Sequence, residues 1–406
     1  MAVPMAQKDR QALRIVHVLR APLGGLFRHV LDLTREQIAR GHQVGLIADS
    51  LTGGSQADRV LAELQPLLAL GLLRIPMRRL PHPSDIPALL CIQRRLRALR
   101  PDVIHGHGSK GGAFARIPGL LGLQGRVIRA YTPHGGSFNY KPGTRFNRAY
   151  MLAERVLERG TDLFLFESVY IGRRFREEVG STAKLTRIVL NGISEAELVP
   201  VPQNPDAADL LYVGEWRSAK GIDTLIDALA LLGRDYAVAA NLILVGSGPD
   251  EAILTDRAAA RKVIDQIRFV PPMRARDAFA LGRIMVVPSR AESLPYIVLE
   301  AAGARIPMVA TNVGGIPEIF GPYQNRLIPA DRPGALAEAL ARALSTPAEQ
   351  LQTQADQLAA FVSTRFSLCG MADAVIAAYR EALTSKGQTP RFLRAPFALP
   401  SWRDAR

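Results

Sequence analysis

The sequence predicts an α/β protein made of two doubly wound domains, each with a parallel sheet covered by helices on both faces. Short apolar runs alternate with longer amphipathic stretches along the 406 residues. These runs are apolar throughout, as expected of strands buried between two layers of helices. The alternation stops at a proline-containing stretch near the middle and then restarts. A chain of this length folds as two or three domains, and the repeated pattern indicates two.

The first half contains six predicted strands separated by segments with helical periodicity. The clearest of these amphipathic segments cover residues 28–40 and 87–100. The predicted strands are 13–19, 44–48, 73–76, 103–105, 127–131 and 163–166.

The second half repeats the pattern after a boundary at residues 193–209, where Pro200, Pro202 and Pro205 disfavour a helix and indicate a linker. We therefore expect an N-terminal domain at 1–195, a C-terminal domain at 196–385, and a tail at 386–406 that is either loose or packed across another surface, with its aromatic residues favouring packing. The predicted strands are 210–213, 242–245, 267–270, 284–287 and 308–310, and the predicted helices are 221–232, 296–304 and 335–344.

The composition is that of a soluble globular protein, with 48% hydrophobic and 22% charged residues. The two cysteines, Cys91 and Cys369, are too few for a disulfide framework or a four-cysteine zinc site and fit a reducing compartment. We expect no signal peptide and no membrane span, because no apolar run approaches the required length. These features predict a cytoplasmic location.

The net charge of +14 lies entirely in the first half of the chain. Residues 1–195 hold 29 basic and 15 acidic side chains, whereas residues 196–406 hold 22 of each. The asymmetry indicates that the first half faces an anionic partner, or that it simply has a soluble basic surface. Aromatic residues make up only 6%, and no recognition motif is present, which argues against a nucleic-acid partner.

Candidate ligand-binding residues in the first half follow its predicted strands, because parallel sheets bind ligands beyond the carboxyl ends of their strands. Gly24 and Gly25 stand at the entry to a helix, where free N–H groups can meet an anion. His105 and His107 end the fourth strand, and His134 follows the fifth. The three histidines could ligate a metal, pack within loops or contact a substrate. No carboxylate or cysteine with convincing ligand spacing accompanies them.

The second half offers two cations and two carboxylates. Arg217 and Lys220 stand three residues apart at a helix entrance, where both can reach one phosphate. Glu292 lies in a loop and Glu300 eight residues later on the following helix, either to bind hydroxyl groups of one ligand or as solvated surface acids. The complete GxGxxG fingerprint is absent, which argues against a dehydrogenase.

These motifs, in this order, resemble the retaining, glycogen-synthase-like glycosyltransferases of family 4, which have the GT-B architecture of two Rossmann-like domains facing a cleft. The resemblance covers nearly the whole chain, and its most specific element is the Glu292/Glu300 pair. One position departs from the family pattern, since Glu215 follows the glycine where arginine is frequent. The matching motifs are Gly24-Gly25, "HGHG" with His107, "NGI" at 191–193, Lys220-Gly221, "VGSGP", Pro288-Ser289 and "TNVGGIPE" at 311–318.

The resemblance implies that the C-terminal domain binds a nucleotide-activated sugar, with UDP as the expected nucleotide, and that the N-terminal domain binds the acceptor. Glu300 would bind the ribose hydroxyls, and Arg217 with Lys220 would neutralise the diphosphate without a metal ion. Glu292 would hold the donor sugar, and His107 would lie near the anomeric carbon. The implied donor site further includes Gly24, Gly25, Tyr296 and Ile297, and the acceptor side includes His134 and Lys110. The resemblance also implies that the tail at 386–406 packs back on the N-terminal domain, with contact between the tail and a membrane as the alternative.

The resemblance also suggests a meaning for the basic first half. Arg94, Arg95, Arg97 and Arg100 stand on one predicted helix, preceded by Arg78 and Arg79, and each could contribute about 1 kcal/mol at an anionic membrane surface. We therefore expect peripheral association with the inner face of the plasma membrane, where a glycan or lipid-pyrophosphate-linked acceptor would be extended into a bacterial surface polysaccharide. The alternatives are a GT-B sugar-nucleotide epimerase or hydrolase, a scaffold that only binds the nucleotide sugar and, less favoured, a basic nucleic-acid-binding protein.

Overall fold

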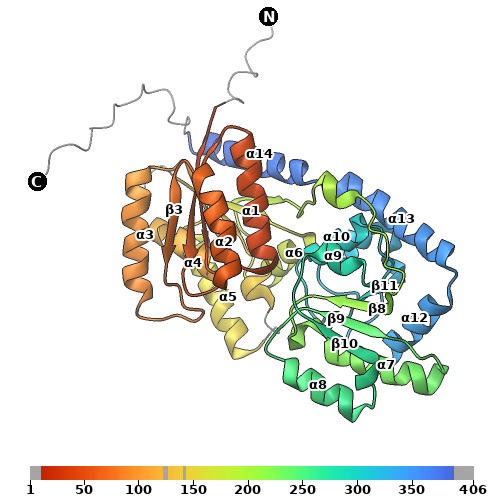
Figure 1. Cartoon of the computed structure of the whole chain (residues 1–406). Coiled ribbons are helices and arrows are strands. Elements are labelled where there is room, and N and C mark those ends of the chain that lie inside the picture. The colour runs from red at the N-terminus through yellow and green to blue at the C-terminus, as the bar shows by residue number, and fades with distance from the viewer. Residues whose placement is uncertain (1–10, 122–126, 140–142, 388–406) are drawn as a thin grey trace, which may run out of the picture. The chain divides into compact units, whose positions relative to one another are not determined.

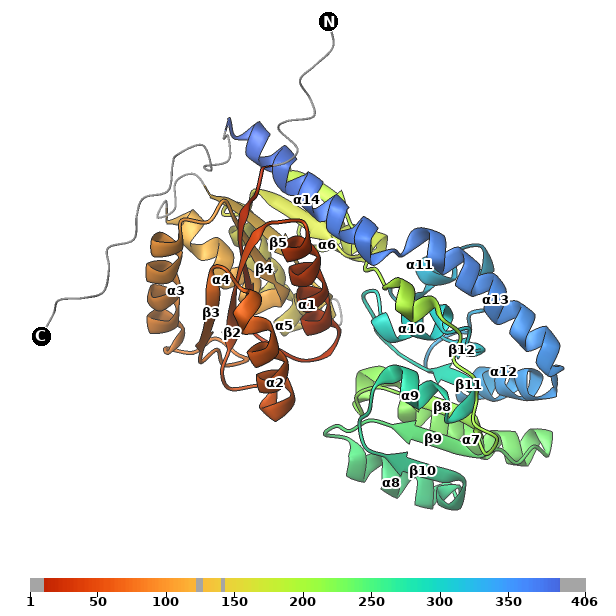
Figure 2. The ribbon, with the colours of Figure 1, turned by 45° about the horizontal axis from the view of Figure 1, so that its top comes forward.

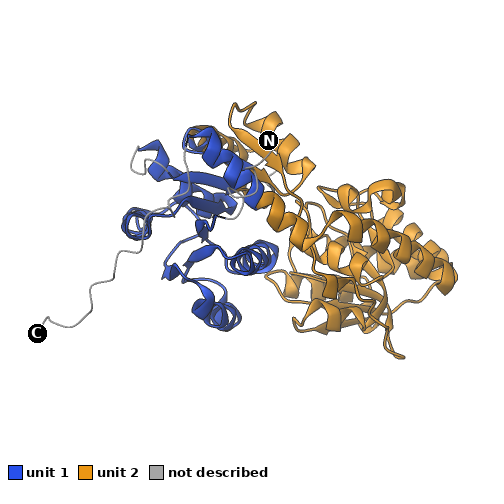
Figure 3. Ribbon diagram, turned by 90° about the horizontal axis from the view of Figure 1, so that it is seen from above, with its two compact units in different colours: residues 1–131, 157–164, 376–406 blue, residues 132–156, 165–375 orange. Residues whose placement is uncertain are grey.

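The computed structural model describes residues 11–121, 127–139 and 143–387. The chain divides into two compact units, shown in separate colours in Figure 3. The first unit comprises residues 1–131, 157–164 and 376–406, and the second comprises 132–156 and 165–375. The tail predicted to pack on the N-terminal domain lies outside the described residues from 388 onward.

The strands of the first half form one sheet in the order β3-β2-β1-β4-β5-β6-β7, and the pairings recorded between them are parallel. Its strands are β1 (Arg14–Leu19), β2 (Gln43–Asp49), β3 (Gly71–Ile75), β4 (Val103–His107), β5 (Ile128–Thr132), β6 (Leu163–Phe166) and β7 (Leu185–Ile188). The helices of this half are α1 (Gly24–Ala39), α2 (Gly54–Leu64), α3 (Asp85–Leu99), α4 (Gly108–Leu120), α5 (Arg145–Glu158) and α6 (Val169–Glu178).

The second sheet has five parallel strands in the order β10-β9-β8-β11-β12. Its strands are β8 (Ala208–Val213), β9 (Leu242–Val245), β10 (Ile267–Val270), β11 (Gly282–Val287) and β12 (Met308–Ala310). The helices are α7 (Ile222–Tyr236), α8 (Glu251–Ala260), α9 (Ala275–Phe279), α10 (Tyr296–Gly303), α11 (Ile316–Phe320), α12 (Pro333–Ser345), α13 (Ala348–Arg365) and α14 (Leu368–Ser385).

Helices cover both faces of each sheet, which explains why apolar residues dominate both faces of the strands instead of alternating with polar ones. In the first sheet, α1 and α2 pack on one face and α3 and α4 on the other. In the second, α7, α8 and α12 pack against one face, and α9, α10, α11 and α13 against the other, as Figures 1 and 2 show. Two parallel sheets enclosed in this way confirm the predicted doubly wound α/β architecture.

All of the predicted strands are present, within a few residues of their expected ends. Strand β7 was missed because its sequence, Leu-Thr-Arg-Ile, mixes polar with apolar residues and stays partly exposed. The predicted linker is free of helix and strand only from 199 to 207. Before it, residues 195–198 form a 3₁₀ turn, because Ser194 and Glu197 cap each other's backbone N–H groups.

Helix α14 returns the chain to the first unit, which it joins at Ile376. Within that unit, the Tyr379 hydroxyl lies 2.7 Å from Nδ1 of His105 on β4. Lys386, just beyond the helix, forms an ion pair of 2.5 Å with Asp162. The C-terminal helix is therefore bonded to the first sheet.

Candidate functional site

Strand order changes direction at one point in each sheet, between β1 and β4 and between β8 and β11. At such a switch point the connections on either side diverge to opposite faces, which leaves a crevice at the carboxyl ends of the strands. The residues that follow these four strands are therefore the first place to look for ligand-binding side chains.

At the switch point of the second unit, Lys220 and Glu292 meet. Lys220 ends a short 3₁₀ turn (Ser218–Lys220) after β8, and Glu292 follows β11. The Lys220 Nζ lies 2.6 Å from Glu292 Oε1, which also accepts a 2.7 Å hydrogen bond from the Ser289 hydroxyl. Glu292 is buried, with 8% exposed. A cation and a carboxylate that are 72 residues apart in sequence thus lie side by side where a ligand is expected.

Glycines allow the loops around this pair to touch. A Cβ atom on Gly221 would lie 2.1 Å from the Pro288 carbonyl oxygen, and one on Gly314 would lie 1.8 Å from that of Glu292. Both glycines also have positive φ angles, of 67° and 59°. The two glycines therefore fix the backbone positions of Lys220 and Glu292.

Arg290 connects the same two loops through hydrogen bonds and ion pairs. Its guanidinium group binds both oxygens of Asp223 at 2.8 Å, the Ser218 carbonyl oxygen at 2.6 Å and the Asp331 carboxylate at 2.9 Å. Its own backbone N–H donates to the Ala219 carbonyl oxygen. This side chain ties the loop after β11 to the segment that carries Lys220.

Arg217, the second predicted phosphate ligand, is about half exposed and pairs with Glu215 at 3.0 Å. Glu215 stands where the family pattern has arginine, so in this chain the acid and the displaced arginine form a local ion pair. Both predicted cations of the second unit are thus held by carboxylates, and an anionic ligand would have to compete with those carboxylates for them.

Helix α10 places the remaining predicted donor residues. Tyr296 and Ile297 lie in its first turn, which Pro295 precedes without a side-chain cap and which contains no acidic residue. Its first N–H groups therefore point toward the loop ahead of the helix and favour an anion. Glu300 is half-buried one turn later.

In the first unit, Gly24 and Gly25 begin α1 and are exposed. Leu23 precedes the helix without a side-chain cap, no acidic residue stands in its first turn, and Gly24 has a φ angle of 67°. A Cβ atom on Gly24 would meet nothing within 4 Å, so the reason for glycine here is its backbone conformation and not a lack of space. The geometry suits the predicted contact between backbone N–H groups and an anion.

His107 ends β4 at the switch point of the first sheet and belongs to a buried group of histidines. His17 on β1 faces the strand that carries His105 and His107, because the parallel register pairs His17 with His105. Nδ1 of His17 lies 2.9 Å from Nε2 of His107, and Nε2 of His17 lies 2.8 Å from the Gln37 side-chain oxygen on α1. Burial lowers the pKa of His17 to about 4, so His17 is neutral near pH 7.

The spacing of His17, His105 and His107 would also fit a metal ion, because one ligand atom from each lies within 4.8 Å of the others. Each ring already has a hydrogen-bonding nitrogen: His17 and His107 bond to each other, and His105 bonds to Tyr379. A metal ion would have to displace the hydrogen bond between His17 and His107.

Lys110, predicted on the acceptor side, ties a loop to α4. Its Nζ forms an ion pair of 2.7 Å with Asp85 and donates to the carbonyl oxygens of Arg78 and Leu80. These contacts hold the segment between β3 and α3, and only 11% of the Lys110 side chain is exposed. The structure thus shows an anchoring contact for this lysine, and its acceptor role stays a prediction.

His134 lies in the second unit, in a turn after β5 with a positive φ of 51°. The turn is held by Glu167, the residue after β6, whose Oε1 accepts a 2.7 Å hydrogen bond from the Gly135 N–H. Burial, with a smaller contribution from the nearby Glu318 carboxylate, raises the pKa of Glu167 to about 7 against the opposing effect of backbone hydrogen bonds. Glu167 is therefore hydrogen-bonded directly to the turn that carries His134.

Glu318 closes the "TNVGGIPE" motif and caps another helix. Its two carboxylate oxygens accept 2.8 Å hydrogen bonds from the backbone N–H groups of Val169 and Tyr170, at the start of α6. The carboxylate satisfies N–H groups that α6 cannot pair internally. This residue of the motif has a structural contact within the described part of the second unit.

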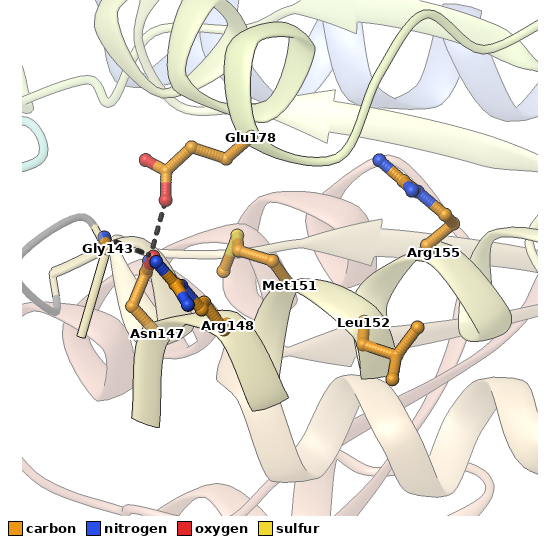
Figure 4. A pocket seen from close by; sticks show the side chains of 7 residues that line it. All are labelled: Gly143, Asn147, Arg148, Met151, Leu152, Arg155 and Glu178. Carbon is orange, nitrogen blue, oxygen red and sulfur yellow. Dashed lines mark hydrogen bonds between the residues drawn. The ribbon is translucent and has the colours of Figure 1, made fainter. Parts of the chain in front are cut away.

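A separate surface hollow lies beside α5, shown in Figure 4. Arg148 and Arg155 stand at its edge, and Asn147 donates a 2.6 Å hydrogen bond to Glu178. It contains none of the predicted site residues, and no role is assigned to it.

Sequence reasoning missed His17, Gln37 and Glu167. His17 was a polar interruption in an apolar strand, which is a usable signal. Gln37 was one polar residue among many on an amphipathic helix, and Glu167 follows a strand without any motif. Their partners depend on strand register and on side-chain direction, which spacing alone does not supply.

The fold and the residues at its switch points define a class of protein, a two-domain GT-B glycosyltransferase. Solved structures of this architecture superpose on most of the chain. A sucrose-phosphate synthase from Thermosynechococcus elongatus matches with a TM-score of 0.75 at 19% identity, over 92% of this chain and 100% of that chain. The Anabaena protein HepE in complex with UDP-glucose matches with a TM-score of 0.73 at 17% identity, over the same shares.

Sequence comparisons give the family. Residues 23–197 match the family model "Glycosyltransferase Family 4", and residues 195–359 match "Glycosyl transferases group 1". A D-inositol 3-phosphate glycosyltransferase from Jonesia denitrificans is 32% identical over 362 residues, which are 79% of this chain and 83% of that protein. A putative teichuronic acid biosynthesis glycosyltransferase from Bacillus subtilis, TuaC, is 32% identical over 280 residues, 64% and 66% of the two chains. The chain belongs to these GT-B glycosyltransferases and is an enzyme of the hexosyltransferase type.

Proposed function

We propose that this enzyme transfers a sugar, with retention of anomeric configuration, from a UDP-sugar to a glycan or lipid-linked acceptor in bacterial surface-polysaccharide synthesis. The observation that carries the proposal is the contact between Lys220 and Glu292 at the β8/β11 switch point. A diphosphate and a sugar ring are adjacent parts of one donor molecule, so a phosphate ligand and a hydroxyl ligand are needed within a few ångströms of each other.

Donor binding would exchange partners within this pair. The diphosphate would draw Lys220 away from Glu292, and the freed carboxylate would accept hydrogen bonds from the sugar hydroxyls. Departure of the nucleoside diphosphate places negative charge on its oxygens and positive charge on the sugar. After exchange of their carboxylate partners, Lys220 and Arg217 would stabilise the departing phosphate together with the uncapped first turn of α10. These charges would make a metal ion unnecessary.

The remaining donor contacts follow from the family resemblance. Glu300 would bind the ribose, with Tyr296 and Ile297 lining the donor site. Gly24, Gly25 and His107 of the first unit would act on the same donor, and His134 and Lys110 on the acceptor. HepE, crystallised with UDP-glucose, and TuaC, described as a teichuronic acid biosynthesis enzyme, support the choices of donor and pathway.

The first experiment measures nucleoside diphosphate release from a panel of UDP-, GDP- and ADP-sugars, with and without a lipid-linked acceptor extract. We expect release that needs both the UDP-sugar and the acceptor and that is lost in Glu300→Ala. Glu338→Ala is the matched control, because Glu338 is an exposed helical glutamate that pairs only with Arg342. Rapid release from the donor alone would favour a hydrolase or epimerase, and no donor binding would refute the proposal.

We also propose that the enzyme associates with an anionic membrane through α3 and the loop before it. Exposed apolar side chains of Leu80, Ile86 and Leu90 lie in the same segment as basic residues. The exposed arginines of the segment are Arg78, Arg79, Arg94, Arg97 and Arg100. Within the described residues, no helix is both long and apolar enough to cross a bilayer.

Binding to anionic vesicles tests this surface, and the burial of each arginine decides which of them to replace. Arg95 is half-buried and donates to the Leu70 carbonyl oxygen, so Arg94 and Arg97 are the better pair to replace. Each arginine is expected to contribute about 1 kcal/mol at an anionic surface, so Arg94→Glu/Arg97→Glu should reduce binding at least tenfold. Unchanged binding at low salt would refute the proposed surface.

A further inference from the structure

The Arg290 guanidinium group uses all of its N–H donors inside the second unit. Nε donates to the Asp331 carboxylate at 3.0 Å, and the two terminal nitrogens bind both oxygens of Asp223 at 2.8 Å. The terminal nitrogens also donate to the Ser218 carbonyl oxygen, the Thr224 hydroxyl and the Asp331 carboxylate, at 2.6, 2.8 and 2.9 Å. A guanidinium group has five N–H donors, so none is left for a phosphate group.

These contacts fix the two loops that carry the candidate donor-binding pair. Ser218 lies two residues before Lys220, and Arg290 lies two residues before Glu292. The Arg290 backbone N–H also donates to the Ala219 carbonyl oxygen at 2.9 Å. One residue thus bonds the loop after β11 to the turn before Lys220 through both its backbone and its side chain.

The bidentate pair between Arg290 and Asp223 is the stronger of the two ion pairs. Its side chains are 25% and 29% exposed, whereas Asp331 is 67% exposed and its pair is weakened by solvent. Two parallel N–H bonds to one carboxylate fix direction as well as distance. Arg290→Lys would keep the positive charge and lose this planar geometry, because an ammonium group has no fork of donors.

We propose that Arg290 is a positioning residue for donor binding, which holds the backbone of Lys220 and Glu292 in place while their side chains exchange partners. The inference rests on the proposed function, because the exchange takes place at the candidate donor site. Without the Arg290 side chain, the turn before Lys220 loses its bond at Ser218, and donor binding would have to order that turn. We expect the affinity for a diphosphate to fall about tenfold, which corresponds to about 1.4 kcal/mol.

Calorimetry with UDP as the probe separates positioning from simple attraction between charges. Arg290→Met removes both the charge and the contacts, whereas Arg290→Lys removes most of the contacts and keeps the charge. We expect UDP affinity to fall about tenfold in both variants. Normal affinity in Arg290→Lys would show that the charge alone is sufficient, and normal affinity in Arg290→Met would show that neither is needed. Either result would overturn the proposal.

Arg257→Met is the matched control. Arg257 makes a bidentate pair with Asp227, which lies one turn beyond Asp223 on α7. The control therefore removes the same charge and a similar ion pair from the same helix, and it leaves the bond to Ser218 in place. Its UDP affinity should stay within about twofold of the wild type. A loss equal to that of Arg290→Met would show a general effect of destabilising the unit and would contradict positioning.

A double-mutant cycle tests whether Arg290 acts through Lys220. In the Lys220→Met background, Arg290→Met should change UDP affinity by less than about twofold, because the phosphate ligand that it positions is already absent. A further tenfold loss in that background would show that the two residues contribute independently, which the proposal does not allow.

Hydrogen exchange of the free protein gives a readout that needs no ligand. The amide groups of Lys220 and Gly221 donate within the turn, to the carbonyl oxygens of Arg217 and Ser218. They should exchange about tenfold faster in Arg290→Met and at the wild-type rate in the control. Unchanged exchange in Arg290→Met would overturn the inference. If the wild type bound no UDP, the proposed function would fail, while exchange would still decide whether Arg290 holds the turn.

Discussion

Replacing Lys220 by methionine separates the two roles of the Lys220–Glu292 pair, which are stability and donor binding. Without Lys220, the buried Glu292 carboxylate retains only the Ser289 hydroxyl among the partners described for it. Breaking a fully buried ion pair by removing one partner costs about 3–5 kcal/mol. Because the Lys220 side chain keeps 18% of its exposure and Ser289 remains, we expect about 2 kcal/mol. For a domain of this size that lowers Tm by about 4–8 °C.

The double variant Lys220→Met/Glu292→Gln provides the decisive comparison. It removes both charges and leaves an amide that can still accept from Ser289, so it should regain most of the stability lost in Lys220→Met. The matched control is Arg342→Met, which breaks the exposed pair with Glu338 and should cost less than about 0.5 kcal/mol. Chemical denaturation of wild type, Lys220→Met, Glu292→Gln and the double variant gives the coupling energy between the two sites.

Donor binding should respond differently from stability. Removing a charged hydrogen bond to phosphate costs about 1.5–3 kcal/mol, so UDP-sugar affinity by calorimetry should fall about 10-fold to 100-fold in Lys220→Met. The double variant should recover stability without recovering affinity. If Lys220→Met were as stable as Arg342→Met and bound the donor normally, both the buried-pair argument and the phosphate assignment would be refuted.

Three further predictions concern the second unit. The pKa of Glu167 is about 7 in the folded state and about 4.5 in the unfolded chain, so its contribution to stability falls as the pH rises through this range. In urea unfolding, the wild type should lose about 2–3 kcal/mol of stability relative to Glu167→Gln between pH 4.5 and pH 8. An identical pH dependence in both proteins would contradict the assignment. Gly314→Ala should destabilise the domain and weaken donor binding, because the new Cβ would collide with the Glu292 carbonyl oxygen. The control is Gly233→Ala on α7, where a Cβ would meet open space. In thermal unfolding this control should be neutral or stabilising by up to about 1 kcal/mol. Glu318→Ala should cost about 1 kcal/mol, because the N–H groups of Val169 and Tyr170 lose their acceptor while the Ser168 side chain still caps the Ile171 N–H. Increased hydrogen exchange at the start of α6 is the expected signature.

The fold could be predicted from the sequence because its main signals are local. Most buried strands are rich in apolar residues on both faces, and glycine or polar residues follow many of them before the next helix. Strand β7 escaped detection because it is short and partly exposed, so it lacks that contrast. The return of α14 to the first unit is not a local property, since it depends on a contact between Tyr379 and His105, 274 residues apart.

For the candidate site, the position of each residue along its strand could be predicted from the sequence, but the contacts between residues could not. Lys220 and Glu292 could be placed at the carboxyl ends of strands, but their contact required β8 and β11 to be neighbours, and the strand order is not written in either segment. The contacts of Lys110 with Asp85 and with two backbone carbonyl groups could not be predicted either, because they join α4 to the distant loop before α3.

The two switch points differ in their electrostatics, and this difference bears on the charge asymmetry of the chain. The second half of the chain carries no net charge, yet the second unit places a cation and a carboxylate in contact at the ends of its strands. The first half carries the whole excess of +14, yet the buried groups at its switch point are histidines, of which His17 is held neutral by burial. A cluster of exposed arginines lies instead on α3 and the loop before it. Positive charge on a surface attracts an extended anionic partner. We therefore propose that the excess charge of the first half serves the surface at α3 rather than the buried switch point.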